Sequence, residues 1–167
     1  ERRELWDQAI AQYEAALGED QALVFAQQGL ARARARADLD SKLSHLLSNP
    51  NLLFDDGVLA DAGTLLADAR GVTDPGPRLT EQTSELDRLL RLASTPVSVE
   101  LESDQLTAVT VYRVGPLGTF ARRTLELRPG TYTAVGSRDG FRDVRATFTV
   151  LPGRALEPVR IACVEPI

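Results

Sequence analysis

Methionine is absent from this chain of 167 residues, and cysteine and histidine occur once each, as Cys163 and His45. A single cysteine excludes an intramolecular disulfide, and one cysteine with one histidine excludes a Cys/His zinc cluster. We therefore expect no bound metal and no cofactor. No apolar run approaches the roughly 20 residues that a helix needs to cross a bilayer. Any membrane attachment is thus expected to come from a segment outside these residues.

The chain begins with Glu1, Arg2 and Arg3, with neither an initiator methionine nor an apolar signal core. We therefore expect a piece of a longer protein. Lysine is scarce too, because Lys42 is the one lysine among nineteen basic residues. Residues 1–95 hold ten basic and sixteen acidic side chains, a net charge of −6, whereas residues 96–167 hold nine arginines and eight acids, a net +1. Without a surplus of positive charge we expect no nucleic-acid partner.

Apolar residues up to about Ala93 recur at spacings of three and four, which predicts helices. The four predicted helices are joined by connections of two to nine residues, which favours antiparallel neighbours. The first runs from Leu5 to Leu17, with Gly18 as a left-handed C-cap. The second runs from an Asp20 N-cap to Leu47 and ends at Asn49 and Pro50. The third starts at Asp55 or Asp56 and reaches Ala69, and the fourth runs from about Arg78 to Leu92.

After Pro96 the apolar period changes to two, which predicts strands. Six strands are expected, over residues 97–101, 109–114, 121–127, 131–137, 144–150 and 158–163. The turns between them are assigned to Gly115-Pro116-Leu117-Gly118, Pro129-Gly130, Asp139-Gly140 and Pro152-Gly153. The predicted fold class is therefore α+β, with an N-terminal antiparallel helical region of about four helices (residues 1–95) followed by a small all-β antiparallel sandwich (residues 96–167).

The first helical pair carries small and aromatic residues in a repeat-like order. Ala9, Tyr13 and Ala16, followed by Phe25 and Gly29, resemble the tetratricopeptide repeat, with Trp6 as an additional large residue. Small residues let paired helices approach closely while aromatic rings fill the gap between pairs. The resemblance covers about 35 residues and fails at Arg32, where the repeat has a tyrosine. A generic helical hairpin is the alternative.

The strand region resembles the PEGA family of surface sandwich domains. The resemblance covers roughly residues 96–163 and is carried by Thr124–Leu127, Pro129–Thr133, Arg138–Phe141, Phe148–Val150 and Pro152-Gly153. It is weakest at Ser103–Thr107, where the family has a proline-glycine-alanine element. A carboxypeptidase-regulatory-like or immunoglobulin-like sandwich is the alternative. The resemblance implies a non-catalytic module of a bacterial envelope protein, found beside helical repeats or after a single membrane span.

Catalytic groups are hard to find. No glycine-rich phosphate loop occurs, because Gly115-x-x-Gly118 lacks the lysine and the following helix. His45 near a helix end is expected to interact with the helix dipole. The acid pairs are expected to be solvated, capping or ion-paired: Asp38 with Asp40, Asp55 with Asp56, and Asp61 with Asp68. We therefore expect no catalytic residues.

Four residues are candidates for partner binding. Arg32 and Arg36 lie one helical turn apart among alanines, which fits either a close helix interface or a recognition edge for an acidic peptide. Leu117 and Phe120 lie near a predicted hairpin tip, where they either form an exposed apolar contact surface or tuck under the sheet edge.

These observations favour a non-catalytic protein-interaction or scaffold module. The PEGA resemblance implies the extracytoplasmic region of a bacterial envelope protein, in the periplasm or cell envelope, with a protein partner or a cell-wall glycan as ligand. One alternative is the sensor region of a membrane-bound signalling enzyme, such as a protein kinase, whose catalytic part lies elsewhere. Another is a cell-wall carbohydrate-binding module, although the exposed aromatic pair typical of such modules is not evident.

Overall fold

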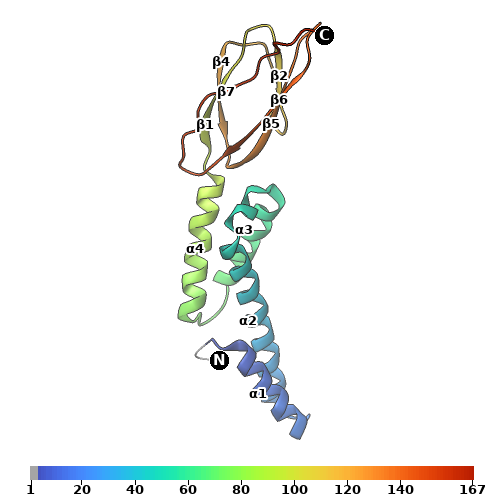
Figure 1. The fold of residues 1–167 in the computed structure, drawn as a ribbon. Coiled ribbons are helices and arrows are strands. Elements are labelled where there is room, and N and C mark those ends of the chain that lie inside the picture. Colours follow the sequence, from blue (N-terminus) through green and yellow to red (C-terminus); the bar gives the residue numbers. More distant parts are fainter. Residues whose placement is uncertain (1–3) are drawn as a thin grey trace. The chain divides into compact units, whose positions relative to one another are not determined.

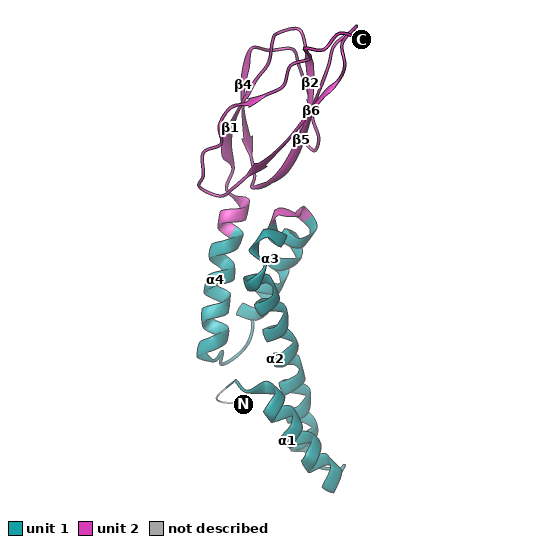
Figure 2. Cartoon of the chain, in the orientation of Figure 1, with its two compact units in different colours: residues 1–53, 57–90 teal, residues 54–56, 91–167 magenta. Residues whose placement is uncertain are grey.

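The computed structural model describes residues 4–167, which form two compact units (Figure 2). The first unit is helical and extends to Leu90, except that Phe54–Asp56 group with the second unit. The second unit runs from Arg91 to Ile167 and contains the strands. Helices come first and strands follow, so the predicted α+β class is confirmed. No helix among residues 4–167 has the length and apolarity required to span a bilayer.

The helical part contains four α-helices and one short 3₁₀-helix within the described range (Figure 1). They are α1 (Trp6–Glu19), α2 (Val24–Ser48), η1 (Pro50–Phe54), α3 (Asp56–Arg70) and α4 (Pro77–Ser94). The predicted stop of the second helix at Asn49 and Pro50 is confirmed, because proline cannot continue the hydrogen-bond ladder.

Two predicted helix ends are wrong. Gly18 does not adopt a left-handed conformation, since α1 continues through it to Glu19 and is followed by Asp20 in an extended conformation. Asp20 does not cap α2, which begins four residues later. Its carboxylate instead accepts the backbone N–H of Ala22 at 2.9 Å, closing a turn between the two helices.

Helices α1 and α2 pack closely through small residues. The Tyr13 ring lies directly over Gly29, where a Cβ would overlap the ring atoms. Trp6 meets Arg36 further along the pair, so the two helices run antiparallel. The buried positions of this interface are small side chains: Ala9, Ala26, Gly29 and Ala33. Short side chains permit a short distance between the two helix axes. Because they are short, they also bury little apolar area in this hairpin.

The rest of the helical unit is built around larger apolar side chains. Its buried apolar residues are Leu43, Leu46, Leu53, Ala62, Leu66, Ala69, Leu79 and Leu86. They recur at helical spacing on α2, α3 and α4, as the sequence predicts. An ion pair of 2.8 Å between Arg70 and Asp87 links α3 to α4.

The strands form two sheets that enclose one apolar core. The three-stranded sheet has the order β4-β1-β7 and the four-stranded sheet the order β3-β2-β5-β6. Their bounds are β1 (Val97–Glu102), β2 (Ala108–Val111), β3 (Gly115–Gly118), β4 (Arg122–Leu127), β5 (Gly130–Ser137), β6 (Val144–Val150) and β7 (Val159–Arg160). The core cluster combines Val99, Leu101 and Leu127 of the first sheet with Val109, Val111, Tyr132, Ala134, Phe148 and Val150 of the second.

The sandwich differs from the prediction in three details. The tetrapeptide Gly115–Gly118 is the edge strand β3 and not a turn, because the chain reverses earlier, at Arg113, whose φ is +70°. The last strand is shorter than expected and covers Val159–Arg160. It pairs with β1 in parallel, so the sandwich is not wholly antiparallel. All other strand pairs within the described residues are antiparallel.

Candidate functional site

The predicted arginine edge on α2 is only partly open. Arg36 donates to the Glu4 carboxylate at 3.4 Å, and its guanidinium lies 4.7 Å from the centre of the Trp6 ring. Its side chain keeps only 16% exposure. Arg32 is exposed and lines, with Arg36, a cavity of about 700 Å³. The two arginines are therefore brought together, but the charge of Arg36 is already used inside the fold.

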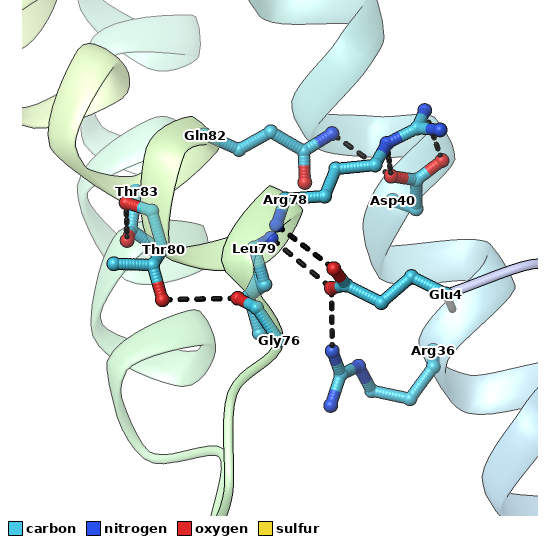
Figure 3. A network of polar contacts seen from close by, with 9 residues as sticks. All are labelled: Glu4, Arg36, Asp40, Gly76, Arg78, Leu79, Thr80, Gln82 and Thr83. Atoms are coloured by element: carbon cyan, nitrogen blue, oxygen red, sulfur yellow. Dashed lines mark hydrogen bonds and ion pairs between the residues drawn. The ribbon is translucent and has the colours of Figure 1, made fainter. Parts of the chain in front are cut away.

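Glu4 itself is the centre of a buried polar cluster (Figure 3). Its carboxylate accepts the backbone N–H groups of Arg78 at 2.8 Å and Leu79 at 3.2 Å. These are among the first N–H groups of α4, which have no partner within the helix. Gly76 lies against the same carboxylate, where a Cβ would overlap it. Glu4 therefore caps a helix that begins 73 residues later in the chain.

A second carboxylate extends this cluster across α2. Asp40 pairs with the Arg78 guanidinium, at 2.7 Å from Nε, and accepts from Gln82 Nε2 at 2.9 Å. Gln82 Nε2 also donates to Ser44 Oγ at 3.1 Å. We call the residues Glu4, Arg36, Asp40, Arg78 and Gln82 the α4 staple. Figure 3 shows that its members come from the start of the chain, α2 and α4. The staple positions α4 against α2 and leaves little free charge for a ligand.

Of the two alternatives for Leu117 and Phe120, the structure has the tucked one and not the exposed contact surface. Leu117 and Phe120 are both partly buried and pack against the sandwich core. The reason is that Leu117 lies on β3, where its side chain faces the core between the two sheets. The exposed apolar side chains nearby are Tyr112 and Val114, which flank the turn at Arg113. Tyr112 is itself covered in part by the Arg145 guanidinium, 6.0 Å from its ring centre.

A groove that combines apolar and charged side chains lies between α2 and α3 in the helical unit. It encloses about 650 Å³, within the range of roughly 300–1,000 Å³ typical of ligand pockets. Its apolar part is made by Leu46, Val58, Ala62 and Leu65, and its polar rim by Ser41, Lys42, His45, Asp61, Thr64 and Asp68. We call this set the α2/α3 groove. Val58 and Leu65 remain partly exposed, so apolar surface is open to a ligand.

The rim of the α2/α3 groove carries a net negative charge. Lys42 on the α2 side is neutralised by Asp38 at 2.6 Å. Asp61 and Asp68 on the α3 side are exposed, and neither carboxylate makes an ion pair or hydrogen bond with any residue that the structure describes. Two uncompensated carboxylates beside apolar surface attract cationic groups.

The sequence signal for this groove lies in spacing. Asp61 and Asp68 are seven residues apart, and so are Val58 and Leu65, which places each pair on one face of a helix two turns apart. The sequence contains this spacing, but surface acids are common on helices. The spacing alone does not show that α2 leaves this face of α3 uncovered. The Glu4 contacts had no comparable sequence signal, because they join distant segments.

The side chains that could bind a metal or act as a nucleophile or base do not form a cluster in the part of the chain that the structure describes. Among residues 4–167 no set of three or more histidine, cysteine, aspartate or glutamate side chains could hold a metal ion. Cys163 is buried, and its thiol donates to the Gly136 carbonyl at 3.3 Å. His45 lies in the last turn of α2, on the groove rim.

The geometry thus defines an α+β chain with a helix-walled, acid-rimmed apolar groove and a sandwich with a closed core. No known family model matches the chain, and no curated protein matches it as a relative.

Proposed function

We propose that this chain is a non-catalytic protein-interaction or scaffold module. The observation that carries the proposal is the α2/α3 groove, where Val58 and Leu65 keep apolar surface accessible beside charged rim residues. Apolar surface framed by polar groups is typical of a site that another molecule covers. Its walls are two helices, a common arrangement for binding a peptide segment.

The two resemblances support the same function. The close α1/α2 packing through Ala26, Gly29 and Ala33 fits a tetratricopeptide-like hairpin, a type of element used in scaffolds. The two-sheet sandwich fits a PEGA-like module. On the basis of this likeness we propose the periplasm or cell envelope of a bacterium as its location, with attachment to the membrane through a segment outside these residues.

The test is site-specific photocrosslinking at the groove. A photoreactive amino acid replaces Thr64 on the rim, and the matched control carries it at Thr147, which is exposed on β6. The proposal expects a discrete adduct of one mass from position 64 in envelope extract. This adduct should be absent from position 147 and should be lost when Leu65→Ser is added. Adducts that do not depend on Leu65, or equal labelling from both positions, would contradict a groove-based interaction.

A further inference from the structure

We propose that the occupant of the α2/α3 groove is an amphipathic helix of a partner protein that carries basic side chains beside its apolar face. This inference rests on the proposed function and specifies the chemistry of the partner. Three features of the groove carry it: its length along α3, the kind of walls it has, and the charge of its rim.

The groove is long in one direction. Its α3 side runs from Val58 to Asp68. Ten residues of α-helix correspond to roughly 15 Å at about 1.5 Å per residue, or nearly three turns. The apolar part of this wall, from Val58 to Leu65, covers seven residues, or roughly 10.5 Å and two turns, and α2 adds a second wall from Ser41 to Leu46. Such a groove can receive the ridge of side chains on one face of a third helix over about two turns, at axis separations of about 8–10 Å. A small compact ligand would use only part of this length.

The walls favour a helix over an extended peptide. Both walls are α-helices, whose backbone N–H and C=O groups are already paired along their own axes. An extended peptide pressed into such a groove would bury its own backbone polar groups without partners, which is unfavourable. A helix satisfies its backbone internally and presents only side chains to Leu46, Val58 and Leu65.

The rim charge selects basic residues. Lys42 is paired with Asp38, so the uncompensated charges are those of Asp61 and Asp68. These two lie seven residues apart, which is roughly 10.5 Å along the helix axis at about 1.5 Å per residue. Lysine or arginine side chains two turns apart on a bound helix match this spacing. Their aliphatic stems can cover apolar surface while the charged ends reach the rim carboxylates.

A second copy of this chain fits the groove less well. The basic stretch of its own helices is on α2, where Arg34 pairs with Glu14 at 2.7 Å and Arg36 with Glu4. The net charge of −5 also opposes association of two copies. Within residues 4–167, the arginines Arg34 and Arg36 of this basic stretch are thus already paired inside the chain.

The experiment uses the full chain and two fluorescent 18-residue peptides with the same leucine pattern. One peptide has lysine at its polar positions and the other has glutamate. Binding is measured by fluorescence anisotropy at 0.15 M salt. The lysine peptide should bind at least about tenfold more tightly than the glutamate peptide, and Leu65→Ser should weaken it. The double variant D61N/D68N should weaken the lysine peptide about five- to tenfold, because two rim ion pairs contribute roughly 0.5–0.7 kcal/mol each.

The matched control is D143N/E157Q, which makes the same change in net charge at exposed positions of the sandwich. It should leave the affinity unchanged. The charge reversal D61K/D68K should transfer the preference to the glutamate peptide, and circular dichroism of each variant checks that the helices remain folded.

The other outcomes overturn the inference in distinguishable ways. Equal affinity for the two peptides, lost with Leu65→Ser, would remove the charge selectivity and keep the proposed interaction function. Equal weakening by the control pair would show general charge attraction only. Binding of neither peptide would overturn the helical basic partner, whereas the crosslinking at Thr64 tests the proposed function by itself. A dimer in sedimentation that D61N/D68N dissociates would make a second copy the occupant.

Discussion

In the sandwich, Val99, Leu101 and Ile161 are completely buried and belong to one continuous apolar cluster. In the helical unit the buried residues include the polar side chains of Glu4 and Gln82, each 7% exposed. Apolar contacts are non-directional and tolerate small shifts, whereas a buried carboxylate needs its donors in place. Among the described residues the sandwich buries one polar side chain, Thr107, whose hydroxyl accepts the Cys163 N–H at 2.9 Å, in a core that is otherwise apolar. The helical unit instead combines apolar packing with a cluster of charged side chains around Glu4.

The two units also differ in how far apart in sequence some of their polar contacts lie. Turns of the sandwich, such as the one closed by the Phe141 N–H and the Arg138 carbonyl at 3.0 Å, use residues close in sequence. The α4 staple joins residue 4 to residues 78 and 79. Long-range contacts of this kind form only when the surrounding helices are already arranged, so they report on the assembled unit.

The largest expected effect comes from emptying the sandwich core. Leu101→Ala should lower the free energy of unfolding of the sandwich by about 2–5 kcal/mol, because it removes a buried side chain and leaves a cavity. Hydrogen exchange followed by mass spectrometry should accelerate in β1 and its neighbours. Leu86→Ala is the counterpart in the helical unit, where Leu86 is equally buried on α4. Acceleration of both units by either variant would show that their stabilities are not separate.

A smaller effect is expected from the α4 staple. Glu4→Gln keeps the shape and removes the charge that accepts the Arg78 and Leu79 N–H groups and pairs with Arg36. We expect a loss of about 1.5–3 kcal/mol, the usual range for hydrogen bonds to a charged group. Fluorescence of Trp6, the single tryptophan, follows the unfolding of this unit.

The control for the staple is Glu14→Gln, which breaks the ion pair with Arg34. Both partners of that pair are at least half exposed, so the change should cost under about 1 kcal/mol. If the Glu4 and Glu14 variants unfolded at the same denaturant concentration, the polar cluster would contribute no more than a surface pair. The contrast between the two units would then be lost.

The sequence predicts much of this fold because most helices and strands are determined by residues close together in the chain. The helices, six of the seven strands in the described residues and the switch of period near Pro96 follow from apolar spacing, proline and glycine. Strand β3 was missed because Gly115 and Pro116 favour turns, and its pairing with β2 overrides that preference. The strand β7 was predicted within residues 158–163, but its parallel pairing was not, because only the tertiary fold brings it beside β1.

The candidate site was harder to predict for the same reason. Leu117 and Phe120 were identified as notable apolar residues, but their alternatives, an exposed tip or a tucked position, depend on a strand that local signals do not show. Arg36 was identified by its place among alanines, and its partner Glu4 is 32 residues away. Asp61 and Asp68 had a visible spacing, yet which helical face stays open is decided by the packing of α2.

The close α1/α2 contact gives a further test within the helical unit. Gly29→Ala places a methyl group where the Tyr13 ring lies, so the ring must move. Overpacking costs about 1–3 kcal/mol, offset by roughly 1 kcal/mol of better helix propensity, which leaves a net loss of up to about 2 kcal/mol. Gly18→Ala is the matched control, because nothing lies within 4 Å of a Cβ there. It should stabilise α1 by up to about 1 kcal/mol in thermal unfolding, and equal effects of the two changes would contradict the close approach.

The smallest expected effect is a pH-dependent one in the sandwich. The Asp104 carboxylate accepts the backbone N–H groups of Leu106 at 2.9 Å and Thr107 at 2.7 Å, and these bonds, with the nearby Arg138, lower its pKa from the ordinary 3.8. A lowered pKa in the folded state means that the charged form adds stability above pH 3.8 and that this stability is lost as the pH falls through the lowered value.

Asp104→Asn should therefore lower the urea midpoint of the sandwich slightly at pH 7, and the difference from the unchanged chain should disappear in strong acid. Asp143→Asn makes the same change of net charge at an exposed position and should leave the midpoint at pH 7 unaltered. A difference at Asp104 that persists at the lowest pH would mean that the charge of the carboxylate is not what stabilises the turn. In that case the charge of Asp104 would add nothing measurable to the stability of the sandwich, whereas the charge of Glu4 is expected to stabilise the helical unit.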